Sequence, residues 1–99
     1  MANERLLIVD DELAIRIALR TAFSRENMIV SEASCGVEAL RLLKTQEFDL
    51  VVLDIMMEDI DGYTILQQLR ADGIMTPVLM LSGKQEEMDQ VLGLGLGAD

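Results

Sequence analysis

Carboxylate side chains follow two apolar runs of this sequence at the point where each run ends. Residues 6–9, Leu-Leu-Ile-Val, lead directly into Asp10 and Asp11. Residues 50–53, Leu-Val-Val-Leu, lead directly into Asp54. Such runs, without alternation, are typical of strands buried on both faces of a parallel sheet. If the two strands pair, about 4.8 Å apart, three carboxylates meet at one edge of the sheet and repel one another.

A cluster of this kind requires a cation, and the available ligands indicate which one. The sequence contains no histidine, and its single cysteine, Cys35, is distant from both acidic turns. Ligand sets made only of oxygen favour Mg²⁺ over zinc or copper. We therefore expect a site for Mg²⁺ (or Mn²⁺) at Asp10, Asp11 and Asp54.

The composition indicates one small acidic domain. The chain has 99 residues, with 18 acidic and 8 basic side chains and a net charge of -10. This charge argues against direct binding of nucleic acid and favours a basic partner surface or a bound cation. The first residues lack the layout of a signal peptide, and no apolar run approaches the roughly 20 residues of a membrane span. We expect a soluble protein of the cytoplasm that does not bind membranes.

Apolar spacing alternates between strand and helix along the chain. This alternation predicts an α/β sheet with right-handed crossovers. The predicted strands cover residues 6–9, 28–32, 50–54 and 78–81, and the predicted helices cover residues 12–26, 35–46, 63–71 and 84–94. The positions expected to face inward are Ile15, Ala18, Leu19, Ala22 and Phe23 in the first helix, and Val37, Leu40 and Leu43 in the second.

Ligands of open doubly wound sheets bind beyond the carboxyl ends of the strands. Asp10, Asp11, Asp54 and Ser82 all lie at such ends. Taken singly, each acidic turn is equally well explained as a solvated loop or a helix cap. Their joint occurrence at two strand ends, with a hydroxyl at a third, favours a functional site.

Three sequence motifs together resemble the receiver domain of two-component response regulators. They are Leu-Ile-Val-Asp-Asp-Glu at 7–12, Leu-Val-Val-Leu-Asp-Ile-Met-Met at 50–57 with Asp-Gly at 61–62, and Val-Leu-Met-Leu-Ser-Gly at 78–83. The similarity in order and spacing extends over the full length. It implies a flavodoxin-like doubly wound parallel sheet with strand order 2-1-3-4 in this chain.

The resemblance also implies a role for each site residue. Asp54 matches the phosphoacceptor, and Asp10 and Asp11 match the acidic pair that binds Mg²⁺ together with Asp54 and the backbone carbonyl of Met56. Ser82 matches the hydroxyl that senses the phosphoryl group. In this family a sensor histidine kinase donates the phosphoryl group, and an output domain or protein partner responds, often in transcription regulation.

Two features depart from the family pattern. Glu58 stands where the family usually has proline, which predicts a looser loop after the phosphoacceptor strand. The sequence ends at Asp99, before the fifth strand, the lysine and the last helix of a receiver. We therefore expect residues 1–99 to be a C-terminally incomplete receiver domain. The edge at residues 78–81 would be open to pairing in a homodimer or a strand-swapped assembly.

Three functional hypotheses follow from these residues. The first is a phosphorylation-controlled switch, which is a signalling domain and not an enzyme in the ordinary sense. The second is a pseudo-receiver or inactive fragment that acts as a protein interaction module. The third is an aspartate-nucleophile phosphohydrolase, which is less well supported because Met56 stands where such enzymes have a second aspartate.

Overall fold

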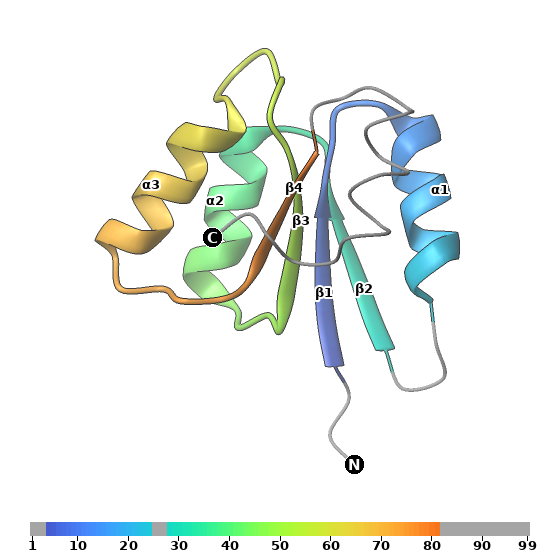
Figure 1. Cartoon of the computed structure of the whole chain (residues 1–99), viewed down its shortest axis with the longest axis horizontal. Helices are drawn as coiled ribbons and strands as arrows, with labels where there is room; N and C mark the ends of the chain where they lie inside the picture. The colour runs from blue at the N-terminus through green and yellow to red at the C-terminus, as the bar shows by residue number, and fades with distance from the viewer. Residues whose placement is uncertain (1–3, 25–27, 82–99) are drawn as a thin grey trace.

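The chain folds into a parallel sheet with helices on both faces (Figure 1). The computed structural model describes residues 4–24 and 28–81. Helices α2 and α3 cover one face of the sheet and α1 covers the other (Figure 1). The strands are β1 (Glu4–Val9), β2 (Met28–Ala33), β3 (Leu50–Asp54) and β4 (Val78–Leu81), and the helices are α1 (Leu13–Phe23), α2 (Gly36–Thr45) and α3 (Gly62–Ala71).

The strand order β2-β1-β3-β4 confirms the predicted flavodoxin-like arrangement. All three strand pairs are parallel. The helix predicted at residues 84–94 lies outside the described residues. Within the described part of the chain, no helix combines the length and apolar character that crossing a membrane requires.

The two central strands are buried on both faces, as their uninterrupted apolar sequence predicts. The side chains of Leu6–Val9 and Val51–Leu53 are 0% exposed. Alternate residues pack into two clusters, one beneath α2 and α3 and one beneath α1. Because a fully buried aliphatic side chain contributes roughly 1.5–3 kcal/mol, these strands form a firm base for the loops at their ends.

The register of β1 and β3 brings their acidic ends to the same level. Val9 is paired with Leu53 across the two strands. Asp10 follows Val9 and Asp54 follows Leu53, so these two acids lie side by side at the carboxyl ends of their strands. Backbone contacts hold both residues: the Asp10 N–H donates to the Ala33 carbonyl at 3.1 Å, and Asp54 pairs with Leu81 of β4.

The predicted inner face of α2 is wrong at Val37, which is 61% exposed. The buried positions of this helix are Gly36, Ala39 and Leu43. Gly36 explains the difference, because a Cβ atom built there would lie 2.8 Å from the Cβ of Ile60. The helix packs closely through its glycine and this contact turns Val37 toward solvent.

The predicted inner face of α1 is correct at Leu19, which is buried, and in part at Ile15 and Phe23, which are half-buried. It is wrong at Ala18 and Ala22, which are exposed. The three residues that face the sheet are four positions apart, so they form a narrower stripe than the sequence predicts. This orientation also brings Arg16 and Arg20 of α1 to Glu32 of β2.

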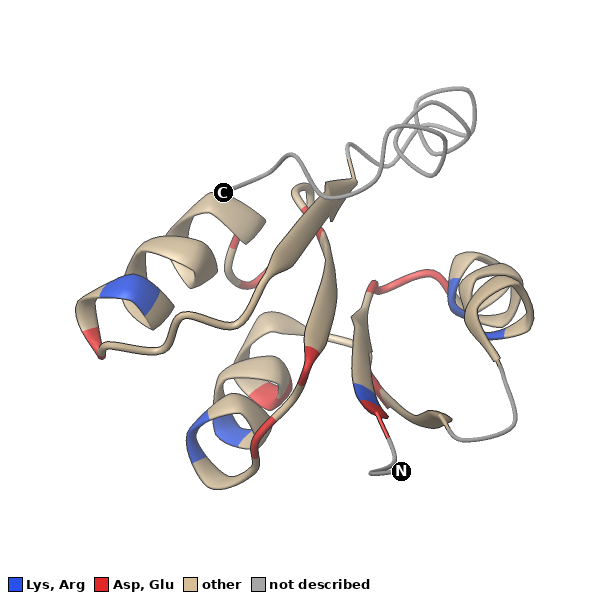
Figure 2. Ribbon diagram, turned by 60° about the horizontal axis from the view of Figure 1, so that its bottom comes forward, with Lys and Arg blue, Asp and Glu red and all other residues tan. Residues whose placement is uncertain are grey.

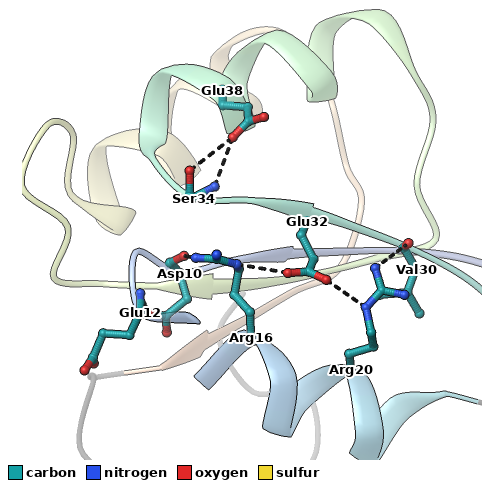
Figure 3. Close-up of polar contacts among 8 residues, drawn as sticks. All are labelled: Asp10, Glu12, Arg16, Arg20, Val30, Glu32, Ser34 and Glu38. Atoms are coloured by element: carbon teal, nitrogen blue, oxygen red, sulfur yellow. Dashed lines mark hydrogen bonds and ion pairs between the residues drawn. The ribbon is translucent and has the colours of Figure 1, made fainter. Parts of the chain in front are cut away.

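Two arginines of α1 bind one glutamate of β2 (Figure 3). Arg16 Nε lies 2.9 Å from Glu32 Oε1, and Arg20 Nε lies 2.7 Å from Glu32 Oε2. Arg16 also donates to the backbone carbonyl of Asp10 at 2.7 Å. Their hydrogen bonds lower the pKa of Glu32, with Arg20 as the largest cause. Arg16 thus connects α1, β2 and the acidic turn.

The two arginines are predicted to differ in their contribution to stability. The side chain of Arg16 is 14% exposed and that of Arg20 is 46% exposed. Arg16→Ala is expected to lower the free energy of unfolding by about 1–3 kcal/mol, because it leaves part-buried acceptors unpaired. Arg20→Ala is expected to lower it by about 1 kcal/mol or less. Urea denaturation of both variants tests this, and equal losses would contradict it.

A second pair of substitutions tests the corrected face of α2. Leu43 is 4% exposed, so Leu43→Ala is expected to lower the free energy of unfolding by about 2–5 kcal/mol. Val37→Ala on the same helix is expected to change it by about 0.5 kcal/mol or less. Denaturant unfolding measures both values. A large loss in Val37→Ala would show that this side chain is buried after all.

Candidate metal centre

Three carboxylates meet at the carboxyl end of the sheet. One carboxylate oxygen each from Asp10, Asp11 and Asp54 lie within 4.8 Å of one another. Asp10 is 1% exposed and Asp54 is 2% exposed, whereas Asp11 is open to solvent. The turn from β1 to α1 is acidic along its length (Figure 2). The predicted convergence of these three side chains is confirmed.

Asp10 has one carboxylate oxygen satisfied and one free to bind a ligand. Its Oδ1 accepts a hydrogen bond from the Glu12 N–H at 2.9 Å. Its Oδ2 is buried and has no hydrogen-bond partner among the described residues. A buried acceptor left without a partner costs roughly 1–3 kcal/mol, and more when charged. A cation at this position would supply the missing partner.

Capping of helix α1 does not explain why this turn is acidic. Helix α1 has Glu12 at its N-cap, and no side chain caps it there. Asp11 is exposed beside the other two carboxylates. Its carboxylate is therefore available to the cluster.

Asp54 is held by the start of the loop that follows it. The Met56 N–H donates to Asp54 Oδ1 at 3.2 Å, and the Ile55 N–H donates to the Leu81 carbonyl at 2.7 Å. Gly62 lies against the same strand end, because a Cβ atom built on it would lie 2.6 Å from the Asp54 carbonyl oxygen. The backbone around Asp54 is therefore tightly packed.

Burial and mutual repulsion favour the protonated forms of the two buried acids. Burial, and after it the charge of Asp10, raise the pKa of Asp54 from 3.8 to about 6, although the Met56 N–H opposes this shift. Burial also raises the pKa of Asp10; the hydrogen bond from the Glu12 N–H opposes this shift and the charge of Asp11 adds to it. A positive charge among the carboxylates would reverse both effects.

The residues present fit a hard divalent cation. Three carboxylates at the ends of two adjacent strands supply oxygen only, and Mg²⁺ binds through few carboxylates together with water. The unpartnered Oδ2 of Asp10 is the observation on which this fit rests. Met56 lies at the rim, where its N–H contacts Asp54; binding through its carbonyl stays a prediction. Ser82 lies outside the described residues, directly after Leu81, which pairs with Asp54.

Sequence reasoning missed two residues that hold the site. Arg16 binds the Asp10 carbonyl, and the available signal was its spacing of four from Arg20 on one helix face. Asp59 accepts hydrogen bonds from the N-terminus of α2. The sequence carries no local signal for that contact, because its partners lie more than 20 positions away.

A shallow cavity of about 480 Å³ lies beside the cluster. Its lining includes Met56, which is 69% exposed, and Tyr63, which is 58% exposed. Both side chains are therefore largely open to solvent. The apolar rim of the site is open to solvent.

The chain matches the family model of the response regulator receiver domain over residues 6–99. It is 46% identical over 97 residues to the alkaline phosphatase synthesis transcriptional regulatory protein PhoP of Bacillus subtilis, covering 98% of this chain and 40% of that protein. It is 42% identical over 95 residues to the response regulator MprA of a Mycobacterium species, covering 96% and 41%. The chain thus spans about two fifths of the length of these curated relatives.

Solved structures give the same result. The receiver domain of the Francisella response regulator 1452 matches with a TM-score of 0.75 and 33% identity, covering 95% of this chain and 79% of that one. The Vibrio cholerae chemotaxis protein CheY4 matches with a TM-score of 0.74 and 26% identity, covering 96% and 82%. Because the family model, the relatives and the fold agree, the chain belongs to the family of response regulator receiver domains.

Proposed function

We propose that this domain accepts a phosphoryl group on Asp54 from the phosphohistidine of a sensor histidine kinase, in a reaction that requires Mg²⁺ or Mn²⁺. The observation that supports it best is a buried Asp54, with a raised pKa, beside two further carboxylates. Burial and repulsion destabilise the ionised form of Asp54, which serves no purpose in an acid with a purely structural role. In a nucleophile they would keep the reactive carboxylate form dependent on a bound cation.

The chemistry of the step follows from the carboxylate. An oxygen of Asp54 attacks phosphorus, the bond from phosphorus to the histidine nitrogen breaks, and an acyl phosphate forms. Both reactants are anionic, and the bound divalent cation supplies the charge that offsets their repulsion. The Met56 N–H holds Asp54 Oδ1 in place.

The remaining site roles in the proposal come from the chain's own residues. Asp10 and Asp11 hold the cation together with Asp54, and the Met56 carbonyl supplies a further oxygen. The Ser82 hydroxyl binds the phosphoryl group once it is on Asp54. Within this proposal the buried, well-packed end of the sheet excludes water from the acyl phosphate and slows its hydrolysis.

The same proposal covers the partners of the domain. Phosphorylation biases an existing equilibrium and exposes a surface to an output domain or protein partner. The relative from Bacillus subtilis bears the name of a transcriptional regulatory protein, which supports an output in transcription. The net charge of -10 argues that any nucleic acid is bound elsewhere than on this domain. Location in the cytoplasm and pairing into a homodimer or strand-swapped assembly belong to the same proposal, as does the assignment of residues 1–99 to a single receiver domain.

The enzymatic hypothesis has no support at the required position. An aspartate-nucleophile phosphohydrolase would need a carboxyl group two residues after Asp54 as an acid and base. The residue there is Met56, whose side chain points to solvent at 69% exposure. We therefore treat the domain as a signalling module.

Incubation with acetyl phosphate tests the proposed function. The intact mass is expected to rise by one phosphoryl group when Mg²⁺ is present, and to stay unchanged without Mg²⁺ or in Asp54→Asn. Mass spectrometry of the whole chain gives the result directly. A folded wild-type chain that gains no phosphoryl group would contradict the proposal and favour an interaction module that does not use phosphorylation.

The raised pKa of Asp54 predicts how stability depends on pH. Between about pH 4 and 6 the metal-free folded protein retains a proton on Asp54 that the unfolded chain has released. The free energy of unfolding contributed by this group therefore falls as pH rises through that window. Added Mg²⁺ binds the ionised form, so its stabilising effect is expected to grow as pH rises through about 6.

Urea denaturation between pH 4 and 7.5, with and without Mg²⁺, measures this dependence. Asp54→Asn is the matched control, because it keeps the size of the side chain and removes its titration. The variant is expected to lose less stability than the wild type between pH 4 and 6. Identical pH slopes in the two proteins would show that Asp54 does not titrate in this range.

A further inference from the structure

Helix α2 receives its N-terminal cap from a distant loop. The helix begins at Gly36, and its N-cap residue Cys35 makes no side-chain capping bond. Asp59 supplies the acceptors instead: its Oδ1 accepts from the Gly36 N–H at 2.9 Å and its Oδ2 from the Val37 N–H at 3.0 Å. One carboxylate therefore satisfies two of the free N–H groups of this helix end.

Donors just before the helix are satisfied locally. Glu38 Oε1 accepts from the Ser34 N–H at 3.0 Å and from the Ser34 hydroxyl at 3.4 Å (Figure 3). This arrangement resembles half of a capping box. Glu38 accepts from Ser34, whereas Asp59 accepts from the Gly36 and Val37 N–H groups. The two acids therefore bind different donors of the same turn.

Asp59 belongs to the loop between β3 and α3, which begins beside the phosphoacceptor candidate. Both ends of this loop are fixed. At its start the Ile55 carbonyl accepts from the Gly62 N–H at 2.8 Å. At its end Asp61 Oδ1 caps α3 by accepting from the Thr64 N–H at 2.8 Å.

The middle of the loop is held against α2. A Cβ atom on Gly36 would lie 2.8 Å from Ile60 Cβ and 3.2 Å from the Ile60 carbonyl oxygen. Ile60 therefore lies directly on the glycine of α2, next to the two bonds of Asp59. These bonds also lower the pKa of Asp59, so the carboxylate is ionised at neutral pH and interacts favourably with the helix dipole.

From this geometry we propose that Asp59 is a positioning residue for the metal centre. By tying the loop to α2, it holds Met56 where its backbone contacts Asp54 and reaches the cation. The inference rests on the proposed function. Proline at position 58, which the family usually has, would restrict the backbone of this loop, and here Glu58 takes its place. We assign the same restricting role to Asp59, one residue later, through its bonds to α2.

Loss of the anchor has two separable consequences. The loop gains freedom that must be lost again when the cation binds, which weakens binding. Helix α2 loses a cap, which lowers stability without acting on the metal. A merely structural role for Asp59 would produce the second effect alone.

Titration with Mg²⁺ alone separates these effects. Asp59→Ala is expected to raise the Kd for Mg²⁺ roughly tenfold, as loss of a group that orients ligands does elsewhere. At saturating Mg²⁺, phosphorylation by acetyl phosphate is expected to return close to the wild-type rate. Glu47→Ala removes the same charge from an exposed position in the loop before β3, at the opposite end of that strand from Asp54, and is expected to leave the Kd unchanged.

Two second-site substitutions in the Asp59→Ala background test the route of the effect. Cys35→Ser gives α2 a local cap and is expected to restore thermal stability and the protection of the Val37 amide from hydrogen exchange, but not the Kd. Glu58→Pro restricts the loop and is expected to recover Mg²⁺ affinity without protecting that amide.

The possible results distinguish this inference from the proposed function. A wild-type Kd in Asp59→Ala, or full recovery of the Kd by Cys35→Ser, would overturn the role of Asp59 while wild-type phosphorylation stands. A folded wild-type protein that neither binds Mg²⁺ nor accepts the phosphoryl group would overturn both.

Discussion

The parallel register of β1 and β3 places buried negative charges side by side, and the structure around the site depends on this constraint. Val9 lies opposite Leu53, so the acids that follow them cannot avoid each other. Their repulsion and burial raise the pKa values of Asp10 and Asp54. Burial of the aliphatic side chains of β1 and β3 offsets the free-energy cost of burying these two acids. A site that works only with a bound cation, as we propose for this one, would depend on such an unfavourable cluster.

Two contacts tie the segments next to the cluster to helices. Arg16 reaches from α1 to the carbonyl of Asp10 and simultaneously binds Glu32 of β2. Asp59 reaches from the loop after β3 to the first turn of α2. Each contact joins one side of the acidic cluster to a helix that packs on the sheet. The segments on the two sides of the acidic cluster are thus tied to helices on both faces of the sheet.

Local sequence predicts the sheet and the acidic cluster well, because both depend on short-range patterns. The apolar runs before Asp10 and Asp54 identify buried parallel strands, and the ends of such strands meet by topology alone. Helix orientation is less predictable. Val37 is exposed because Gly36 packs against a residue 24 positions away, and no periodicity in α2 contains that information. The contacts of Arg16 and Asp59 likewise span elements whose relative positions only the fold determines.

If Asp10, Asp11 and Asp54 form one cation site, crystals of the domain grown with Mn²⁺ at neutral pH will hold the ion there. Anomalous scattering locates the ion. We expect one anomalous peak bound by oxygens of these three carboxylates, with the free Oδ2 of Asp10 directed at the ion or at a water bound to it. A well-ordered cluster without a peak, or a peak held by other residues, would show that the three carboxylates do not form this site.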